Sequence, residues 1–336
     1  MGLLGAFTRV KLKLHKVESG SLRVKALAAK NLDAMFDTFE ENLPESDYLV
    51  GWVDCAAGGS GLGRGEIHRA NYLKAGEDPL GAAGFDPDKQ DLPSRIFGIP
   101  KSQLWRFMQP FMNNLGVPLV NTAKYHMARL AHGKTYHQSH VAFAFLLDYV
   151  PDWRLAYGPE GFIQYQVFIP KETARQTLKD ILALCRERSL PSYLGVLKRH
   201  RPDAFLLSHA VDGYSLAMDF RVTKSNRERL WQLTHDMTDR VLDAGGRFYM
   251  AKDAVLRPGD LERAYGASRL DAFRDLKARL DPDNALQSDL SRRVMPSLAA
   301  PRGTTGATLA ASVASDTPAA LTADTAEVRV VQPSPA

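Results

Sequence analysis

The feature that most constrains the fold is a regular succession of strand and helix patterns between residues 162 and 253. Phe162-Ile-Gln-Tyr-Gln-Val-Phe-Ile169 has the β-branched and aromatic composition of a strand, and Pro170 ends it. A helical stripe follows, then strand patterns at 192–198 and 214–222, a second helical stripe and a last strand at 247–251. This β-α-β-β-α-β order predicts an antiparallel sheet with both helices on one face, a split-βαβ arrangement.

A second, weaker unit of the same kind is expected between residues 20 and 54. Its helix is indicated by apolar residues at i, i+3, i+4 and i+7, with Asn31 as N-cap: Leu32, Met35, Phe36 and Phe39. Tyr48-Leu-Val-Gly-Trp-Val53 follows as a strand. The two units together predict the fold class α+β.

The two ends of the sequence differ in character. Residues 8–14 alternate basic and apolar side chains, with Val10, Leu12 and Leu14 on one face, which predicts a half-buried strand. A sequence that opens in a strand suggests that further residues belong upstream. Residues 296–336 are mostly Ala, Thr, Pro, Ser and Gly, and we expect them to be disordered because they cannot offset their ordering entropy.

Turn and cap signals fill in the rest. Residues 74–135 are expected to form an irregular excursion with helical turns near 101–114. The second helix of the 162–253 unit should begin at a capping box, Ser225 to Glu228, and end at Gly245-Gly246. Asp281-Pro-Asp-Asn284 predicts a turn.

Charge and cysteine content limit the classes of function. The formal charge of +5 is spread along the chain, so it favours anionic ligands only weakly and argues little for nucleic acid. RNA-binding sheets display aromatic residues in a basic-glycine-aromatic context, which these strands lack. Only Cys55 and Cys185 occur, so no disulfide framework is indicated. No apolar run approaches the ~20 residues of a transmembrane helix, and we expect a cytoplasmic protein.

Two local motifs invite a ligand-binding interpretation. The glycine-rich stretch Gly58 to Gly65 matches neither the Walker pattern nor G-x-G-x-x-G, so a flexible hairpin turn is favoured over a phosphate loop. His132, His137 and His140 lie close together in sequence, but without nearby carboxylates or a clear helical face. A polar or substrate-facing loop is favoured there over a metal site.

Paired amides and two lysines are further candidates. Gln164 and Gln166 project from the same face of the strand 162–169. Because two unpaired amides are costly to bury, they indicate a polar cavity, with an exposed sheet face as the alternative. Lys198 and Lys252 each end an expected strand, where a lysine is usually solvated.

Several short stretches occur in one order along residues 2–294. They are Gly2-Leu-Leu-Gly5, Gly51-Trp-Val-Asp54, Leu62-Gly-Arg-Gly65, Ala156-Tyr-Gly-Pro-Glu-Gly-Phe-Ile-Gln-Tyr-Gln166, Leu194-Gly-Val-Leu-Lys198, Ala217-Met-Asp-Phe220, Gly245-Gly-Arg-Phe-Tyr-Met-Ala-Lys-Asp253 and Asp281-Pro-Asp-Asn-Ala-Leu-Gln-Ser-Asp-Leu-Ser-Arg-Arg293. Each alone is weak. In their shared order they resemble the vanillyl-alcohol-oxidase type of FAD-linked oxidases, most closely its decaprenylphosphoryl-ribose oxidase branch.

The resemblance implies a bipartite flavoenzyme. One domain binds FAD, and a second, with a large antiparallel sheet and flanking helices, caps the flavin and forms the substrate pocket. By position, the backbones of Gly5 and Phe7 are implied to lie beside FAD, and Tyr249 to contact it. Lys252 is implied to lie at the junction of flavin and substrate.

The same resemblance implies a substrate pocket and a reaction. The pocket would be lined by Gln164, Gln166, Lys198 and Trp52. A C–H bond next to a hydroxyl gives its hydride to the flavin while a base takes the hydroxyl proton. Lys252 as a cation would stabilise the negative charge on the reduced ring. Lys198 could hold a hydroxyl or phosphate of the substrate.

The sequence departs from the family pattern in three places. The pyrophosphate-binding N-terminal domain has no counterpart, so a truncated or mis-started coding sequence is expected. Ala217 stands where the family has a cysteine beside the pocket, and Ser215 where it has an asparagine. Ala144-Phe145 replaces a tyrosine-histidine pair. A sugar, a polyol and another hydroxylated compound are therefore equally open as substrates.

The expected organisation follows. Residues 1–17 would end the FAD-binding domain, 18–246 form the substrate-binding cap, 247–295 return to the FAD domain, and 296–336 form the disordered tail. We expect an FAD-dependent oxidoreductase, or its substrate-domain fragment, acting on a small hydroxylated molecule, alone or with a separately encoded FAD-binding domain. No metal is expected. The alternative is a non-catalytic binding or remnant protein with a cap-like fold and no flavin.

Overall fold

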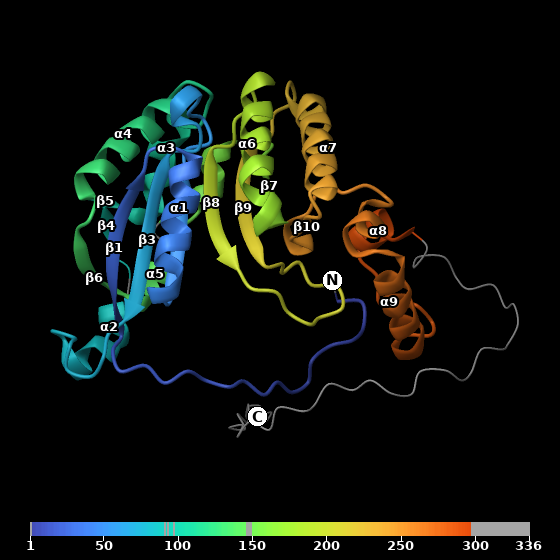
Figure 1. Cartoon of the computed structure of the whole chain (residues 1–336), viewed down its shortest axis with the longest axis horizontal. Coiled ribbons are helices and arrows are strands. Elements are labelled where there is room, and N and C mark those ends of the chain that lie inside the picture. Colours follow the sequence, from blue (N-terminus) through green and yellow to red (C-terminus); the bar gives the residue numbers. More distant parts are fainter. Residues whose placement is uncertain (1, 91, 93, 97, 146–149, 297–336) are drawn as a thin grey trace, which may run out of the picture.

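A large antiparallel sheet runs through the molecule (Figure 1). The computed structural model describes residues 2–90, 92, 94–96, 98–145 and 150–296. In this part of the chain the sheet has eight strands: β1 (Ser21–Ala29), β2 (Tyr48–Val53), β3 (Gly65–Tyr72), β6 (Thr135–Ser139), β7 (Phe162–Pro170), β8 (Leu194–His200), β9 (Gly213–Arg221) and β10 (Arg247–Phe248). A separate small ribbon pairs β4 (Arg95–Ile96) with β5 (Ile99–Pro100).

Helices flank the sheet on both faces and follow it at the C-terminal side. They are α1 (Leu32–Asn42), α2 (Pro87–Gln90), α3 (Leu104–Met108), α4 (Gly116–Ala131), α5 (His140–Ala144), α6 (Lys171–Glu187), α7 (Arg227–Asp243), α8 (Asp260–Tyr265), α9 (Ala267–Leu280) and α10 (Asp289–Val294). The chain is thus α+β with a large antiparallel sheet, as the sequence predicts. None of these helices is long and apolar enough to cross a bilayer.

Two split-βαβ units build the sheet. The strand order is β10-β7-β9-β8-β2-β3-β1-β6. The first four strands, with α6 and α7, form the predicted β-α-β-β-α-β unit, which is confirmed. The other four repeat the same order in reverse, so the weaker unit expected at 20–54 is also present and extends to β6. The two units are joined where β2 pairs with β8, with Trp52 opposite Val196.

One face of the sheet packs against α1, α6 and α7 (Figure 1). The helix stripes predicted from spacing are buried there, and Asn31 caps α1 by accepting a hydrogen bond from the Ala34 amide. Alternate strand residues supply the other half of this core: Ile67, Ile163, Tyr165, Val167, Leu197, Tyr214, Leu216, Met218 and Phe220. Ion pairs from Lys179 and Arg175 to Asp33 tie α6 to α1.

Helix α4 covers part of the opposite face. It is held by Asp54, whose side chain is 1% exposed and accepts hydrogen bonds from Asn121 of α4 and from Arg64. Arg64 also donates to Thr122 of α4. A short turn between β2 and β3 positions Arg64 for this role, so the Gly58–Gly65 stretch closes a hairpin, as predicted.

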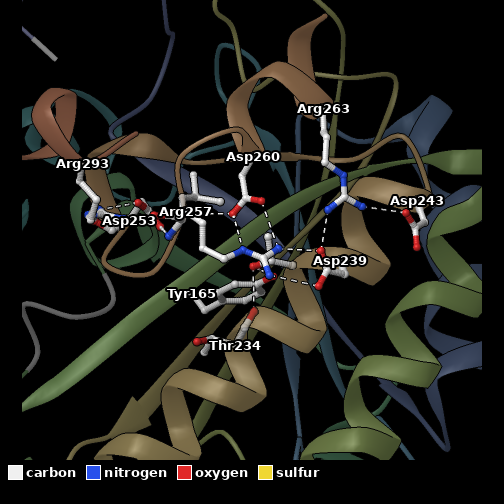
Figure 2. A network of polar contacts seen from close by, with 11 residues as sticks. Tyr165, Thr234, Asp239, Asp243, Asp253, Arg257, Asp260, Arg263 and Arg293 are labelled. Atoms are coloured by element: carbon white, nitrogen blue, oxygen red, sulfur yellow. Dashed lines mark hydrogen bonds and ion pairs between the residues drawn. The ribbon is translucent and has the colours of Figure 1, made fainter. Parts of the chain in front are cut away.

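The C-terminal helices pack beside α7 through a charged network (Figure 2). Arg257 contacts Asp239 of α7 at 2.6 Å and the buried Asp260 at 3.1 Å. Arg263 reaches the same Asp239 at 2.6 Å. These contacts attach the segment that follows β10 to the split-βαβ unit that contains α6 and α7.

Four local predictions are wrong. The excursion expected to be irregular at 74–135 contains a regular helix of 16 residues, α4. Residues 8–14 form no strand, and Val10, Leu12 and Leu14 are exposed, because an alternating stretch needs a neighbouring strand and the described chain pairs none with it. The last strand spans only Arg247–Phe248 before the chain turns. No Ser225 capping box forms; instead Asn226 and Thr223 bond to each other just before α7 begins. The expected disorder of the tail lies outside the described residues from 297 onward.

Candidate functional site

The sheet register brings predicted pocket residues onto one face. Gln166 lies opposite Ala217, Ala217 opposite Val196, and Val196 opposite Trp52. Directly paired residues of antiparallel strands share a face, so this row crosses four strands on one side of the sheet. Core residues such as Tyr165 and Leu216 point to the other side, toward the helices. The row therefore lies on the face away from α1, α6 and α7.

Lys198 and Gln164 belong to neighbouring rows of the same face. Lys198 of β8 pairs with Ser215, which pairs with Phe168. Gln164 pairs with Asp219, which pairs with Leu194. The glutamines are partly buried, and Lys198 is exposed. The two amides are therefore not on a fully exposed sheet face, and the polar cavity stays a prediction.

Lys252 reaches this face from the segment just after β10, at the end of the unit that contains α6 and α7. Strand β10 stops after Phe248, and a short 3₁₀ turn, Met250–Lys252, brings the lysine back beside β7. Its Nζ donates a hydrogen bond of 3.1 Å to Oε1 of Gln166. The same Nζ lies 5.4 Å from the centre of the Tyr249 ring, and the Tyr249 amide donates to the Gln166 carbonyl at 3.1 Å. The ammonium, the amide and the tyrosine thus form one cluster.

Asp219 is a member of this face that the sequence analysis did not select. Its side chain is fully buried, and its Oδ1 accepts a hydrogen bond of 2.6 Å from Nε2 of Gln164. The Tyr157 hydroxyl lies 3.5 Å from Oδ2. Burial raises the pKa of Asp219 to about 6, opposed by the Gln164 hydrogen bond and by the charge of Lys252. Its alternation with Ser215 and Ala217 was visible in the sequence, but its pairing with Gln164 depends on register.

The charges on this face act on one another. Burial lowers the pKa of Lys252; the nearby Asp219 carboxylate raises it, and Lys198 lowers it again. The three groups therefore lie close enough to interact although they come from β8, β9 and the turn after β10. The result is two ammonium groups around one buried carboxylate, a set able to hold an anionic or hydroxylated molecule.

A histidine and aromatic cluster borders the lysines. Nε2 of His200 lies 2.8 Å from Oγ of Ser215. The Phe168 ring packs 4.7 Å from His200 and 4.4 Å from His209, and His209 meets the Tyr249 ring edge-on at 4.9 Å. Burial lowers the pKa of His200 to about 4, so this imidazole is neutral at physiological pH.

Gly5 and Phe7 do not belong to the face. They lie on the N-terminal segment before β1, and 94% of the Phe7 surface is exposed. Leu3, nearby, is buried in the main core. The backbone role expected for Gly5 and Phe7 beside FAD stays a prediction.

The three clustered histidines have separate surroundings. Nδ1 of His132 accepts a hydrogen bond from the Ala28 amide, and His140 packs on the rings of Tyr48 and Tyr72. Among the described residues, no group of three or more His, Cys, Asp or Glu side chains could hold a metal ion. Surface hollows of about 330 and 410 Å³ lie elsewhere, and neither is lined by Lys198, Lys252 or the two glutamines.

The fold is that of an α+β protein of two split-βαβ units, and their shared sheet presents a face of charged and polar side chains. The chain is 26% identical over 296 residues to decaprenylphosphoryl-beta-D-ribose oxidase of Mycolicibacterium smegmatis. This match covers 87% of the chain and 61% of that oxidase, so the chain spans about three fifths of the relative's length. It is also 24% identical over 303 residues to an uncharacterized protein in the mprA 5' region of Streptomyces coelicolor, covering 88% of the chain and 78% of that protein. No protein-family model matches the chain.

Proposed function

We propose that the chain is the substrate-binding part of an FAD-linked oxidoreductase that oxidises a hydroxyl-bearing molecule such as a sugar or polyol. The observation that carries the proposal is the contact between the Lys252 ammonium and the Gln166 amide beside Tyr249. These residues come from separate parts of the sequence and meet on one sheet face. The resemblance in sequence to a named flavin-type oxidase supports the same class.

The residues of the face suit the ring end of a flavin. Tyr249 offers an aromatic surface, and Lys252 offers a cation whose lowered pKa reflects partial burial. The glycine-rich turn Gly58–Gly65 leads directly into strand β3, so it offers no helix N-terminus for a pyrophosphate. In this proposal the face would receive the isoalloxazine ring, while the phosphate contacts would come from another part of the protein.

Each residue has a proposed role in the oxidation. Bound FAD would supply the hydride acceptor. Lys252, as a cation, would stabilise negative charge that develops beside it, an effect that is strong because the group is already in place. Gln164 and Gln166 would orient substrate hydroxyls, and Lys198 would hold a hydroxyl or an anionic substituent.

The proposed domain organisation follows the same logic. Residues 18–246 contain nearly all of the two split-βαβ units and would form the cap over the flavin. Residues 1–17 and 247–295 would contact the FAD-binding domain. That domain would belong to the same protein or be separately encoded.

A binding experiment tests the proposal. The purified chain is titrated into FAD while flavin fluorescence is followed, and the mixture is then challenged with polyols and sugars without oxygen. We expect the unmodified chain to quench flavin fluorescence, and Lys252→Met to bind FAD more weakly. Lys171→Met is the matched control, since Lys171 pairs with Asp212 away from the face.

The outcomes separate the two functions considered. Equal flavin binding by the unmodified chain and Lys252→Met would remove Lys252 from the cofactor site. A colourless chain that ignores FAD, even when the N-terminal region of the Mycolicibacterium smegmatis oxidase is supplied, would favour the non-catalytic binding protein instead.

A further inference from the structure

Helix α4 presents apolar side chains outward. Its sheet-facing side is Val117, Asn121, Tyr125 and Ala128, all of which are buried. The opposite side continues from the N-cap in steps of three and four residues, which places it on one stripe of the helix. We call these residues the α4 stripe: Leu115, Leu119, Ala123, Met127 and Leu130.

The stripe is far more exposed than the apolar side of a surface helix normally is. Leu119 is 65% exposed, Met127 68% and Leu130 78%. The sheet-facing side of the same helix is already buried and includes Asn121, so α4 has a second apolar side, exposed, which an ordinary surface helix lacks. Contiguous apolar surface on this scale marks an interaction site. Figure 1 shows α4 at one margin of the molecule, where such a surface is accessible.

The sequence around the stripe has a strong charge bias. The whole chain contains 38 Asp and Glu residues, yet residues 92–147 contain none. The same stretch holds six Lys and Arg residues, among them the exposed Arg106, Arg129 and Lys134, together with four histidines. Phe107 and Phe111, in the turns just before α4, are about half exposed.

The exposed apolar stripe and the absence of acidic residues in the surrounding sequence together indicate the kind of partner. We infer that α4 lies on an anionic lipid bilayer, with the stripe inserted among the headgroups and the basic residues against lipid phosphates. A helix with exposed leucine and methionine on one side, and with exposed phenylalanines and cations nearby in the sequence, matches the pattern of an interfacial helix. A second copy of the chain is disfavoured, because two such surfaces facing each other would oppose like charges.

The inference does not depend on the proposed chemistry. It concerns a different surface, and vesicle binding is measured without FAD or substrate. It has a direct consequence for the polar face, since Lys124 of α4 lies 4.2 Å over the Trp52 ring. A bilayer under α4 would therefore lie close to one end of the candidate site.

Vesicle sedimentation with the full chain tests the inference. One set of vesicles is phosphatidylcholine mixed with phosphatidylglycerol, and the other is phosphatidylcholine alone. The test variant is Leu119→Asp with Met127→Asp. The matched control is Phe205→Asp with Leu280→Asp, which removes two exposed apolar side chains and adds two charges outside α4.

We expect the unmodified chain and the control to sediment with anionic vesicles and to bind neutral vesicles at least tenfold more weakly. The fraction of protein bound to anionic vesicles should correspond to a partition coefficient at least tenfold lower for the stripe variant. For Arg129→Gln the partition coefficient should fall about fivefold, the loss typical of one cation at an anionic surface. Equal sedimentation by stripe variant and control would overturn the inference. So would a chain that ignores vesicles but forms a dimer that the stripe variant dissociates, because the stripe would then contact a second copy.

Discussion

Replacing Asp219 by asparagine isolates the energetic effect of a single buried carboxylate. Its raised pKa means that the ionised form is less favourable in the folded chain than in the unfolded one. Protonation therefore favours folding, so this group's contribution to stability is complete below the ordinary pKa of 3.8 and is lost as pH rises to about 6. The substituted amide would keep an acceptor for Gln164 without carrying a charge.

The magnitude follows from the shift. A rise from 3.8 to about 6 corresponds to about 3 kcal/mol between the two protonation states. About 2 kcal/mol of this change falls between pH 4 and pH 7. The free energy of unfolding of Asp219→Asn, relative to the unmodified chain, should therefore rise by that amount across the interval. Lowered carboxyl pKa values elsewhere, such as that of Asp239 beside Arg257, occur in both proteins and cancel.

Urea unfolding of both proteins at several pH values measures this difference. Asp275→Asn is the control, because it makes the same substitution at an exposed carboxylate. A difference for Asp219→Asn that stays level with pH, or that falls with rising pH, would refute the reasoning. Either result would mean that the carboxylate is better solvated or better paired than its contacts with Gln164 and Tyr157 indicate.

Further predictions concern the contacts that hold the site and the C-terminal helices. Arg64→Ala should lower the free energy of unfolding by about 3 kcal/mol in urea, because it leaves the buried Asp54 without its charged partner. Under the proposed function, FAD affinity should fall with rising pH as Lys252 loses its proton, and because the pKa of Lys252 is lowered, this should occur at a lower pH than for an ordinary lysine. Lys252→Arg should remove this loss of affinity at alkaline pH in fluorescence titrations, because arginine keeps its charge. Arg257→Ala should lower the free energy of unfolding by about 2 kcal/mol and open the C-terminal helices to limited proteolysis first, because the buried Asp260 loses its guanidinium partner and keeps only the hydrogen bond from the backbone amide of residue 257. Cleavage in the sheet first would contradict this prediction.

Local pattern was enough to predict the main architecture. Strands β7 and β9 alternate between core and polar face, and the stripes of α6 and α7 follow helical spacing, so their order determines the split-βαβ unit. The same reasoning failed at residues 8–14, where Leu12 and Leu14 alternate as a strand would. Alternation indicates which residues could share a face, but a strand also needs a pairing partner.

The candidate site was predicted only in part, for a related reason. Gln164 and Gln166 stood out because amides are unusual in an apolar strand. Asp219 was missed because its importance comes from lying opposite Gln164, and register across strands is not written in either strand alone. Lys252 was selected by family resemblance, since a lysine at a strand end is ordinarily solvated.

The seam where β2 meets β8 is only three residue pairs long. Trp52 lies on one side of it, whereas Gln166 and Lys252 lie on the other. A molecule that contacted both Trp52 and the pair Gln166 and Lys252 would bridge the two halves of the sheet. A slight change of twist at the seam would then alter the distance between Trp52 and the pair Gln166 and Lys252. The strand pairing inside each unit would stay intact, so the twist at the seam would set the width of the site.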